Sequence, residues 1–347
     1  MTSSIRRDLA RPIVALLGLF VVAPCAAVSS PAAAPSLRTV RGPIESRDEF
    51  LLAQSLLTLP PMAATPTSAG RSIVRIDFDW GNDFGLEASP GGRLEDLLFF
   101  VDGEHRTLAA TIRRGFAGGW AVGARVPVHW RGGGWLDTVI DPFHELFGFP
   151  DSGRSLYPTG RLRIEGRRAE GEPLAWSGRA GAGLGSVELE IVKAIRTGTS
   201  GGPAVAVVAR ALLPTSTGAF EEAGRGAGAQ AVLSQPLGAA FDLHFGAGAT
   251  VLGPSERDGI PYARNRGQGF LTLEWRPVRA WSALVQWEAS SRLVTDVDRY
   301  PALQLMLRIG SKVDAGPWRL EGGFVEGIED LDATTDFGVF AAVGRSF

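Results

Sequence analysis

The residues best suited to chemistry gather in one segment, 131–159, where acids, a histidine and an arginine stand among aromatic side chains. A histidine beside carboxylates is the arrangement of an acid–base cluster or a metal site. A metal is disfavoured because no second histidine or cysteine lies nearby. A polar network that pins a folded segment is the simpler interpretation. We therefore expect a binding or pinning role, and no catalytic residue, metal or cofactor, for Asp137, Asp141, His144, Asp151 and Arg154.

The 4 histidines of the chain give no stronger case for an enzyme. Membrane hydrolases pair a histidine with a serine or an aspartate near the membrane edge. No His-x-Ser-like motif surrounds His105, His129, His144 or His244. A membrane-embedded hydrolase is therefore the least favoured function.

The segments that would position these residues alternate apolar and polar side chains from residue 71 to the end of the chain. In 241–251, for example, Phe241, Leu243 and Phe245 fall on one side of a strand, and Asp242 and His244 fall on the other. Such segments are about ten residues long, the length that a tilted strand needs to cross a bilayer. The pattern predicts an all-β protein, a transmembrane antiparallel β-barrel.

The last segment, DFGVFAAVGRSF, has the features of a closing barrel strand. It alternates in the same way and ends on an aromatic residue, Phe347. A terminal apolar strand would leave a hazardous free edge in a soluble sheet, whereas a barrel pairs it on both sides. A terminal Phe also resembles the signal that outer-membrane barrels present to their assembly machinery, so we expect that machinery as a partner through Phe347.

Tryptophans lie mostly near strand ends on the apolar faces, as in the aromatic girdles of membrane barrels. A soluble β-sandwich, the alternative, would bury its tryptophans mid-strand. We count about 14 strands, within about 12 to 16. This count takes 94–102 and 105–114 as two strands joined by a turn at Gly103-Glu104, and it includes 159–168 as a strand.

With that count, the long segment 131–159 falls on the periplasmic side, where turns are short. We therefore expect it to fold back into the lumen as a plug. A miscounted strand would make it an ordinary external loop instead, and that alternative stays open.

The N-terminus has the pattern of a secretory signal, residues 1–27: Arg6 and Arg7, an apolar core, and Cys25-Ala26-Ala27 as a cleavage site. Residues 28–70 form a Pro/Ala/Ser linker and an N-terminal segment, and residues 71–347 form the barrel. Ser46 and Glu49 have capping-box spacing, which favours a short helix over about residues 47–58. The alternative is an extended segment in or beneath the barrel mouth.

Composition limits the partners. The 35 basic and 37 acidic residues nearly cancel, which gives no reason to expect a nucleic-acid surface. A mean hydropathy of +0.07 suits a barrel, in which alternate residues face lipid. Outer-membrane lipid is thus an expected partner, and the cell outer membrane the expected location.

A family resemblance agrees with this interpretation. GGGWLDTVIDPFHELFGFPDSGR is similar to the Gly–aromatic–Leu-Asp, His and Phe-Gly-x-Pro-x-x-Gly-Arg pattern of domain-of-unknown-function family 3187. GPIESRDEF, Trp80-Gly81-Asn82 and Val101-Asp102-Gly103-Glu104 look like other blocks of that family, over about residues 41–347. The resemblance implies an outer-membrane barrel and supplies no reaction.

Taken together, the sequence predicts a passive channel for small molecules, hydrophobic ones included, whose solute it does not name. A lumen lined with Gly, Ala and Arg favours a conduit. The alternative is a structural or surface-interaction barrel without transport.

Overall fold

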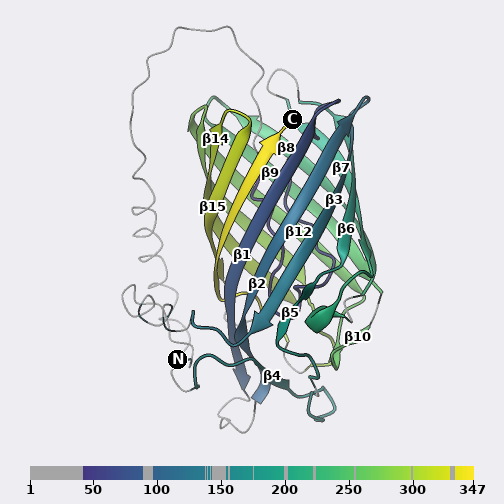
Figure 1. Cartoon of the computed structure of the whole chain (residues 1–347), viewed down its shortest axis with the longest axis vertical. Helices are drawn as coiled ribbons and strands as arrows, with labels where there is room; N and C mark the ends of the chain where they lie inside the picture. Colours follow the sequence, from purple (N-terminus) through teal and green to yellow (C-terminus); the bar gives the residue numbers. More distant parts are fainter. Residues whose placement is uncertain are drawn as a thin grey trace.

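The computed structural model is a closed β-barrel (Figure 1). It describes residues 42–347 except 89–96, 137, 139, 141, 143–153, 155–156, 175, 199–201, 222–223, 254, 298–299 and 329–332. Over these residues, no helix combines the length and the apolar character required to cross a membrane.

The main sheet has 14 strands, and the barrel wall is this sheet without the short strands β4 and β5, which leaves 12. Neighbouring wall strands pair antiparallel, and β16 closes the barrel by pairing with both β15 and β1. The predicted closing strand is thus confirmed. The wall consists of β1 (Ser72–Ala88), β2 (Leu97–Phe116), β3 (Trp120–Gly132), β6 (Val187–Arg196), β7 (Ala204–Leu213), β8 (Gly226–Leu237), β9 (Phe241–Leu252), β12 (Asn265–Val278), β13 (Trp281–Ser291), β14 (Leu303–Ala315), β15 (Trp318–Gly327) and β16 (Phe337–Ser346).

The two ends of the barrel differ in their connections. At one end, the turn end, β8–β9 and β14–β15 are joined by tight turns with Gly238 at φ 68° and Gly316 at φ 63°, a conformation that residues with a Cβ rarely adopt. The C-terminus lies at this end, where the Phe347 N–H donates to the Ser72 carbonyl. At the other end, the loop end, longer connections carry β4 (Arg163–Gly166), β5 (Gly181–Leu184), the hairpin of β10 (Glu256–Arg257) and β11 (Ile260–Pro261), and the 3-10 turn η4 (Gly218–Phe220).

The outside of the wall is apolar, and the inside is largely polar apart from two small apolar clusters that include Phe270 and Phe340. On β9, Phe241 and Phe245 are 41% and 49% exposed, whereas Asp242 and His244 are buried toward the lumen. This is the inverse of a soluble protein and matches the predicted alternation. Exposed aromatic side chains form a belt near the turn end: Phe116, Trp120, Phe241, Trp275, Trp318 and Phe347.

The strand count differs from the predicted 14 for a local reason. Residues 97–102 and 105–114, from two predicted segments, belong to one 20-residue strand, β2, because Asp102, Gly103 and Glu104 continue the ladder with β1. The predicted strand 159–168 contains the short β4, an addition to the edge of β2. The turn predicted at Gly103-Glu104 is therefore wrong. The segment 131–159, predicted on the periplasmic side, begins at the loop end, and most of its residues between 137 and 156 lie outside the described part of the chain. β3 ends at Gly132, at the loop end.

Candidate functional site

The lumen is filled by the N-terminal segment, residues 42–64, which we call the plug. Nearly all its residues are buried, although it contains no helix and no strand. The helix predicted for about residues 47–58 is wrong. The alternative is confirmed, because the segment is extended inside the barrel apart from turns at residues 51–55.

The plug enters the lumen from the turn end and returns to it. Near the turn end, the Pro43 carbonyl accepts a hydrogen bond from Lys312 Nζ at 2.6 Å. On the way back, the Pro60 carbonyl accepts from Gln230 at 2.8 Å, and the Ala64 N–H donates to Ser234 Oγ at 3.0 Å. The chain then continues into β1. The plug is thus a hairpin-shaped loop with both ends on one side of the barrel.

The tip of the plug packs into an apolar cap at the loop end. Phe50, Leu51, Leu52 and Leu57 are at most 1% exposed. They form one cluster with residues of β2, β4, β11 and the 292–300 connection, Tyr300 among them. This cluster is the largest apolar core among the described residues, and it closes the loop end over the plug.

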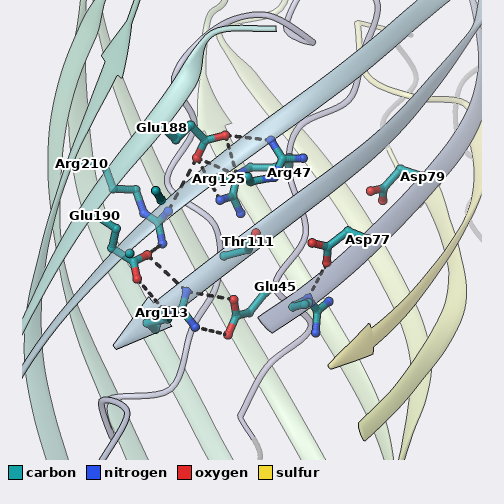
Figure 2. A pocket seen from close by; sticks show the side chains of 13 residues that line it. Glu45, Arg47, Asp77, Asp79, Thr111, Arg113, Arg125, Glu188, Glu190 and Arg210 are labelled. Atoms are coloured by element: carbon teal, nitrogen blue, oxygen red, sulfur yellow. Dashed lines mark hydrogen bonds and ion pairs between the residues drawn. The ribbon is translucent and has the colours of Figure 1, made fainter. Parts of the chain in front are cut away.

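Between tip and turn end, the plug contacts the wall through charged side chains (Figure 2). Glu45 accepts hydrogen bonds from both terminal nitrogens of Arg113, at 3.1 and 3.2 Å. Arg47 donates to Glu188 at 2.9 Å. These partners come from β2 and β6, whose alternation points them inward.

Two more plug acids make similar contacts. Asp48 pairs with Arg266 at 3.2 Å. Glu49 accepts from Thr107 Oγ1 and lies 3.8 Å from Arg125. Buried charges are stable only when paired and hydrogen-bonded, so these contacts fix the register of the plug in the lumen.

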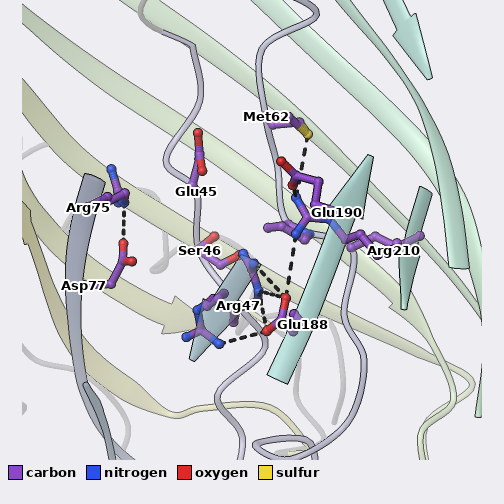
Figure 3. A network of polar contacts seen from close by, with 12 residues as sticks. Glu45, Ser46, Arg47, Met62, Arg75, Asp77, Glu188, Glu190 and Arg210 are labelled. Atoms are coloured by element: carbon purple, nitrogen blue, oxygen red, sulfur yellow. Dashed lines mark hydrogen bonds and ion pairs between the residues drawn. The ribbon is translucent and has the colours of Figure 1, made fainter. Parts of the chain in front are cut away.

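Other ion pairs join wall residues to one another (Figure 3). Arg210 pairs with Glu190 and lies 3.7 Å from Glu188, and it also reaches Met62 Sδ of the plug at 3.8 Å. Arg113 donates to Glu190 at 2.6 Å. The wall acids therefore keep basic partners of their own, independent of the plug.

Little space remains around these groups. A cavity lined by charged side chains of the plug and of β1, β2, β3, β6 and β7 has room for about one or two water molecules. With the plug seated, this part of the lumen does not admit an organic solute.

One polar cluster has the composition of a hydrolase triad. His244 lies between Ser234, 2.8 Å from Nδ1, and Glu274, 3.3 Å from Nε2. All three are at most 2% exposed, and Ser234 Oγ also accepts from the Ala64 N–H of the plug. The cluster can anchor the returning part of the plug, because its serine is covered by the segment that it binds.

Of the predicted binding residues, Asp137, Asp141, His144 and Asp151 lie outside the described residues. Arg154 is described, and it is buried at the loop-end rim. It donates to Asn82 Oδ1 at 2.8 Å, pairs with Asp336, and stacks over Phe84.

The functional residues that sequence reasoning missed are the plug charges Glu45, Arg47, Asp48 and Glu49. A signal was present, because four charges within five residues stand in an otherwise largely apolar stretch. In a barrel with a polar interior, such a stretch has complementary partners on the wall.

Comparison with known proteins identifies the family of the chain. The family described as "Protein of unknown function (DUF3187)" matches residues 18–346, nearly the whole chain. No curated protein matches the chain in sequence.

Among solved structures, the chain is similar to the COG4313 outer membrane channel from Pseudomonas putida F1, with a TM-score of 0.56 and 9% identity. That similarity covers 84% of this chain and 100% of the other. The KdgM porin has a TM-score of 0.41 at 7% identity, covering 79% and 99% of the two chains. A mutant of the TodX monoaromatic hydrocarbon channel has a TM-score of 0.40 at 9% identity, covering 82% and 91%. At these identities the first similarity supports the fold alone, that of an outer-membrane barrel. By its match over residues 18–346, the chain belongs to the DUF3187 family.

Proposed function

We propose that this protein is an outer-membrane channel for small molecules and that the plug closes it in the conformation described here. The turn end would face the periplasm and the loop end the outside, as in barrels with short periplasmic turns. The apolar outer wall and the aromatic belt support a membrane location, because amphipathic rings prefer the depth of the lipid headgroups.

The observation that carries the proposal is the path of the plug. Both ends of the hairpin-shaped loop lie at the turn end, near Pro43 and Ala64. The plug can therefore leave the lumen toward that side without threading its chain through the barrel.

The type of contact along the plug supports the same conclusion. Between tip and turn end the plug contacts the wall largely through hydrogen bonds and ion pairs. Water can replace such contacts, so the net free energy of each is only about 0.5–1.5 kcal/mol, or about 1.5–3 kcal/mol when one group is charged. The largest apolar cluster is at the tip, and two smaller ones lie toward the turn end, around Met62 and around Ile44.

The lumen wall favours polar solutes over the hydrophobic ones that the sequence left open. Inward-facing side chains include Gln230, Thr272, Gln286, Arg308 and Glu321, all of which are buried around the plug. Once the plug withdraws, these groups would line a hydrated path.

Conductance of the refolded protein in a planar bilayer tests the proposal. We compare the mature chain with a variant in which residues 42–64 are replaced by a Gly/Ser stretch of the same length. We expect rare openings from the mature chain and sustained conductance from the variant. Heat-modifiable migration in SDS confirms that each barrel has assembled. An assembled variant that does not conduct would refute the channel and favour a structural barrel.

A further inference from the structure

Arg266 on β12 is a fully buried cation whose charge partner belongs to the plug. Its Nη2 lies 3.2 Å from Asp48 Oδ2, and it donates to Ser290 Oγ at 2.9 Å and to Gln304 Oε1 at 3.1 Å. Within the described part of the chain, Asp48 is the one carboxylate at ion-pair distance from it. Ser290 and Gln304 are neutral, so the wall residues that donate to or accept from Arg266 in the described part of the chain do not balance its charge.

The guanidinium also has unused hydrogen-bonding capacity. Arg266 is 0% exposed, and its Nη1 has no hydrogen-bond partner among the described residues. A buried charged group with a free donor is costly, so the site can accept a carboxylate that binds both terminal nitrogens, whereas Asp48 binds Nη2 alone.

A second basic residue of the wall, Arg113, also turns the terminal nitrogens of its guanidinium toward a plug carboxylate. Arg113 uses Nε and Nη2 for Glu190 of the wall, and it directs Nη1 and Nη2 to the carboxylate of Glu45. When the plug leaves, these terminal nitrogens can bind another acceptor, while Glu190 remains paired with Arg113.

Withdrawal of the plug changes the charge of the lumen in one direction. Residues 42–64 contain Glu45, Asp48 and Glu49 against Arg47, so −3 and +1 give −2. The lumen thus becomes two units more positive, and Arg266 loses its counter-ion.

We propose that the solute of the open channel is a small organic anion, and that its carboxylate binds Arg266 in the place of the Asp48 carboxylate. The planar guanidinium, with Ser290 and Gln304 beside it, suits a planar carboxylate that accepts two hydrogen bonds. The plug occupies the site as an internal competitor. This inference rests on the proposed channel function and names the class of its solute.

The test uses the Gly/Ser variant of residues 42–64, with succinate as the probe and neutral succinamide as its control. In a KCl gradient, the reversal potential should show preference for chloride over potassium. Succinate should reduce the chloride current, and succinamide should not. In the same background, Arg266→Gln should weaken the succinate block about tenfold or more, the effect of losing a charged hydrogen bond.

Arg276→Gln is the matched control. It removes the same charge from the lumen, but the ion-pair partner of Arg276 is Asp242 of the wall. We expect it to leave the succinate block within about threefold of the parent, because it does not touch the carboxylate site. A conducting barrel without anion preference, or equal effects of the two substitutions, would overturn the inference and leave the channel standing. Absence of conductance would instead refute the proposed function.

Discussion

Asp48→Asn should release the plug by removing the counter-ion of a buried cation. Arg266 is 0% exposed, and its ion-pair partner among the described residues is Asp48. Breaking a buried ion pair by removing one partner costs about 3–5 kcal/mol, because the remaining charge is left uncompensated. In the withdrawn state water can solvate Arg266, so this cost falls on the seated plug alone.

Because asparagine keeps one oxygen acceptor, we take the lower limit, about 3 kcal/mol, as the expected change. That free energy lowers the ratio of seated to withdrawn plug about 140-fold. Single-channel recording measures it directly as the ratio of closed to open time. The double variant Asp48→Asn/Arg266→Gln should recover most of the closed time, since it leaves no charge unpaired.

Glu45→Gln is the control within the plug. The Glu45 side chain is 25% exposed, and Arg113 keeps Glu190 as a partner at 2.6 Å. Its removal should cost about 1 kcal/mol, about fivefold in the closed-to-open ratio. The reasoning is refuted if Asp48→Asn opens the channel no more than Glu45→Gln does, or if the double variant is as open as Asp48→Asn alone.

Three further predictions concern the barrel. Leu271 lies on the outer face, about 10 Å from the aromatic belt by strand rise and tilt, so Leu271→Arg should lower the free energy of unfolding by about 2–4 kcal/mol. Val313→Arg, near the belt, should lower it by only about 0–1 kcal/mol. Urea titration in lipid vesicles measures both, and equal losses would show that the outer face is misassigned. Deleting Phe347, which pairs with Ser72 as β16 meets β1, should reduce the amount of assembled protein in outer-membrane fractions, and an unchanged amount would show that this residue is dispensable for assembly. A cysteine in place of Thr138, which is exposed at the loop end, should react with a membrane-impermeant thiol reagent on whole cells; labelling only after lysis would contradict the proposed orientation.

The barrel could be predicted because the alternation of apolar and polar side chains that produces it lies within each strand. Alternation of Phe241, Asp242, Leu243 and His244 already separates a lipid face from a lumen face, whatever the neighbouring strands are. The closing strand could be predicted for the same reason, since an alternating apolar strand needs a partner on both edges.

Gly103 shows why the strand count was off. Next to Glu104 it resembled a tight turn, yet its backbone continues the β1–β2 ladder. A Cβ at this position would lie 2.9 Å from Leu51 and 2.7 Å from Leu162. The glycine thus permits the close approach of the plug tip, and this approach is a tertiary contact that local pattern does not contain.

A helix was favoured over the extended plug for a related reason. Ser46 and Glu49 have the spacing of a helix cap, but Ser46 Oγ donates to Glu288 at 2.7 Å and Glu49 accepts from Thr107. Both side chains thus bind wall residues more than fifty positions away in the sequence, and not the backbone N–H groups that a helix cap would use. Sequence reasoning expected a plug at 131–159, because a miscounted strand put the start of that segment on the periplasmic side; most of residues 137–156 lies outside the described part of the chain.

A disulfide between the plug tip and the wall tests the central claim that movement of the plug opens the channel. An ideal Cβ at Gly226 lies 3.2 Å from Leu57 Cβ, close to the separation of about 3.5–4.5 Å found in disulfides. The natural chain contributes no competing thiol once the predicted signal is removed, since its 1 cysteine is Cys25.

The measurement is the bilayer conductance of Leu57→Cys/Gly226→Cys before and after reduction, with each single variant as control. We predict that the oxidised protein stays closed and that a reductant restores the openings of the mature chain. An oxidised barrel, shown to be fully cross-linked, that conducts as well as the reduced one would contradict the account.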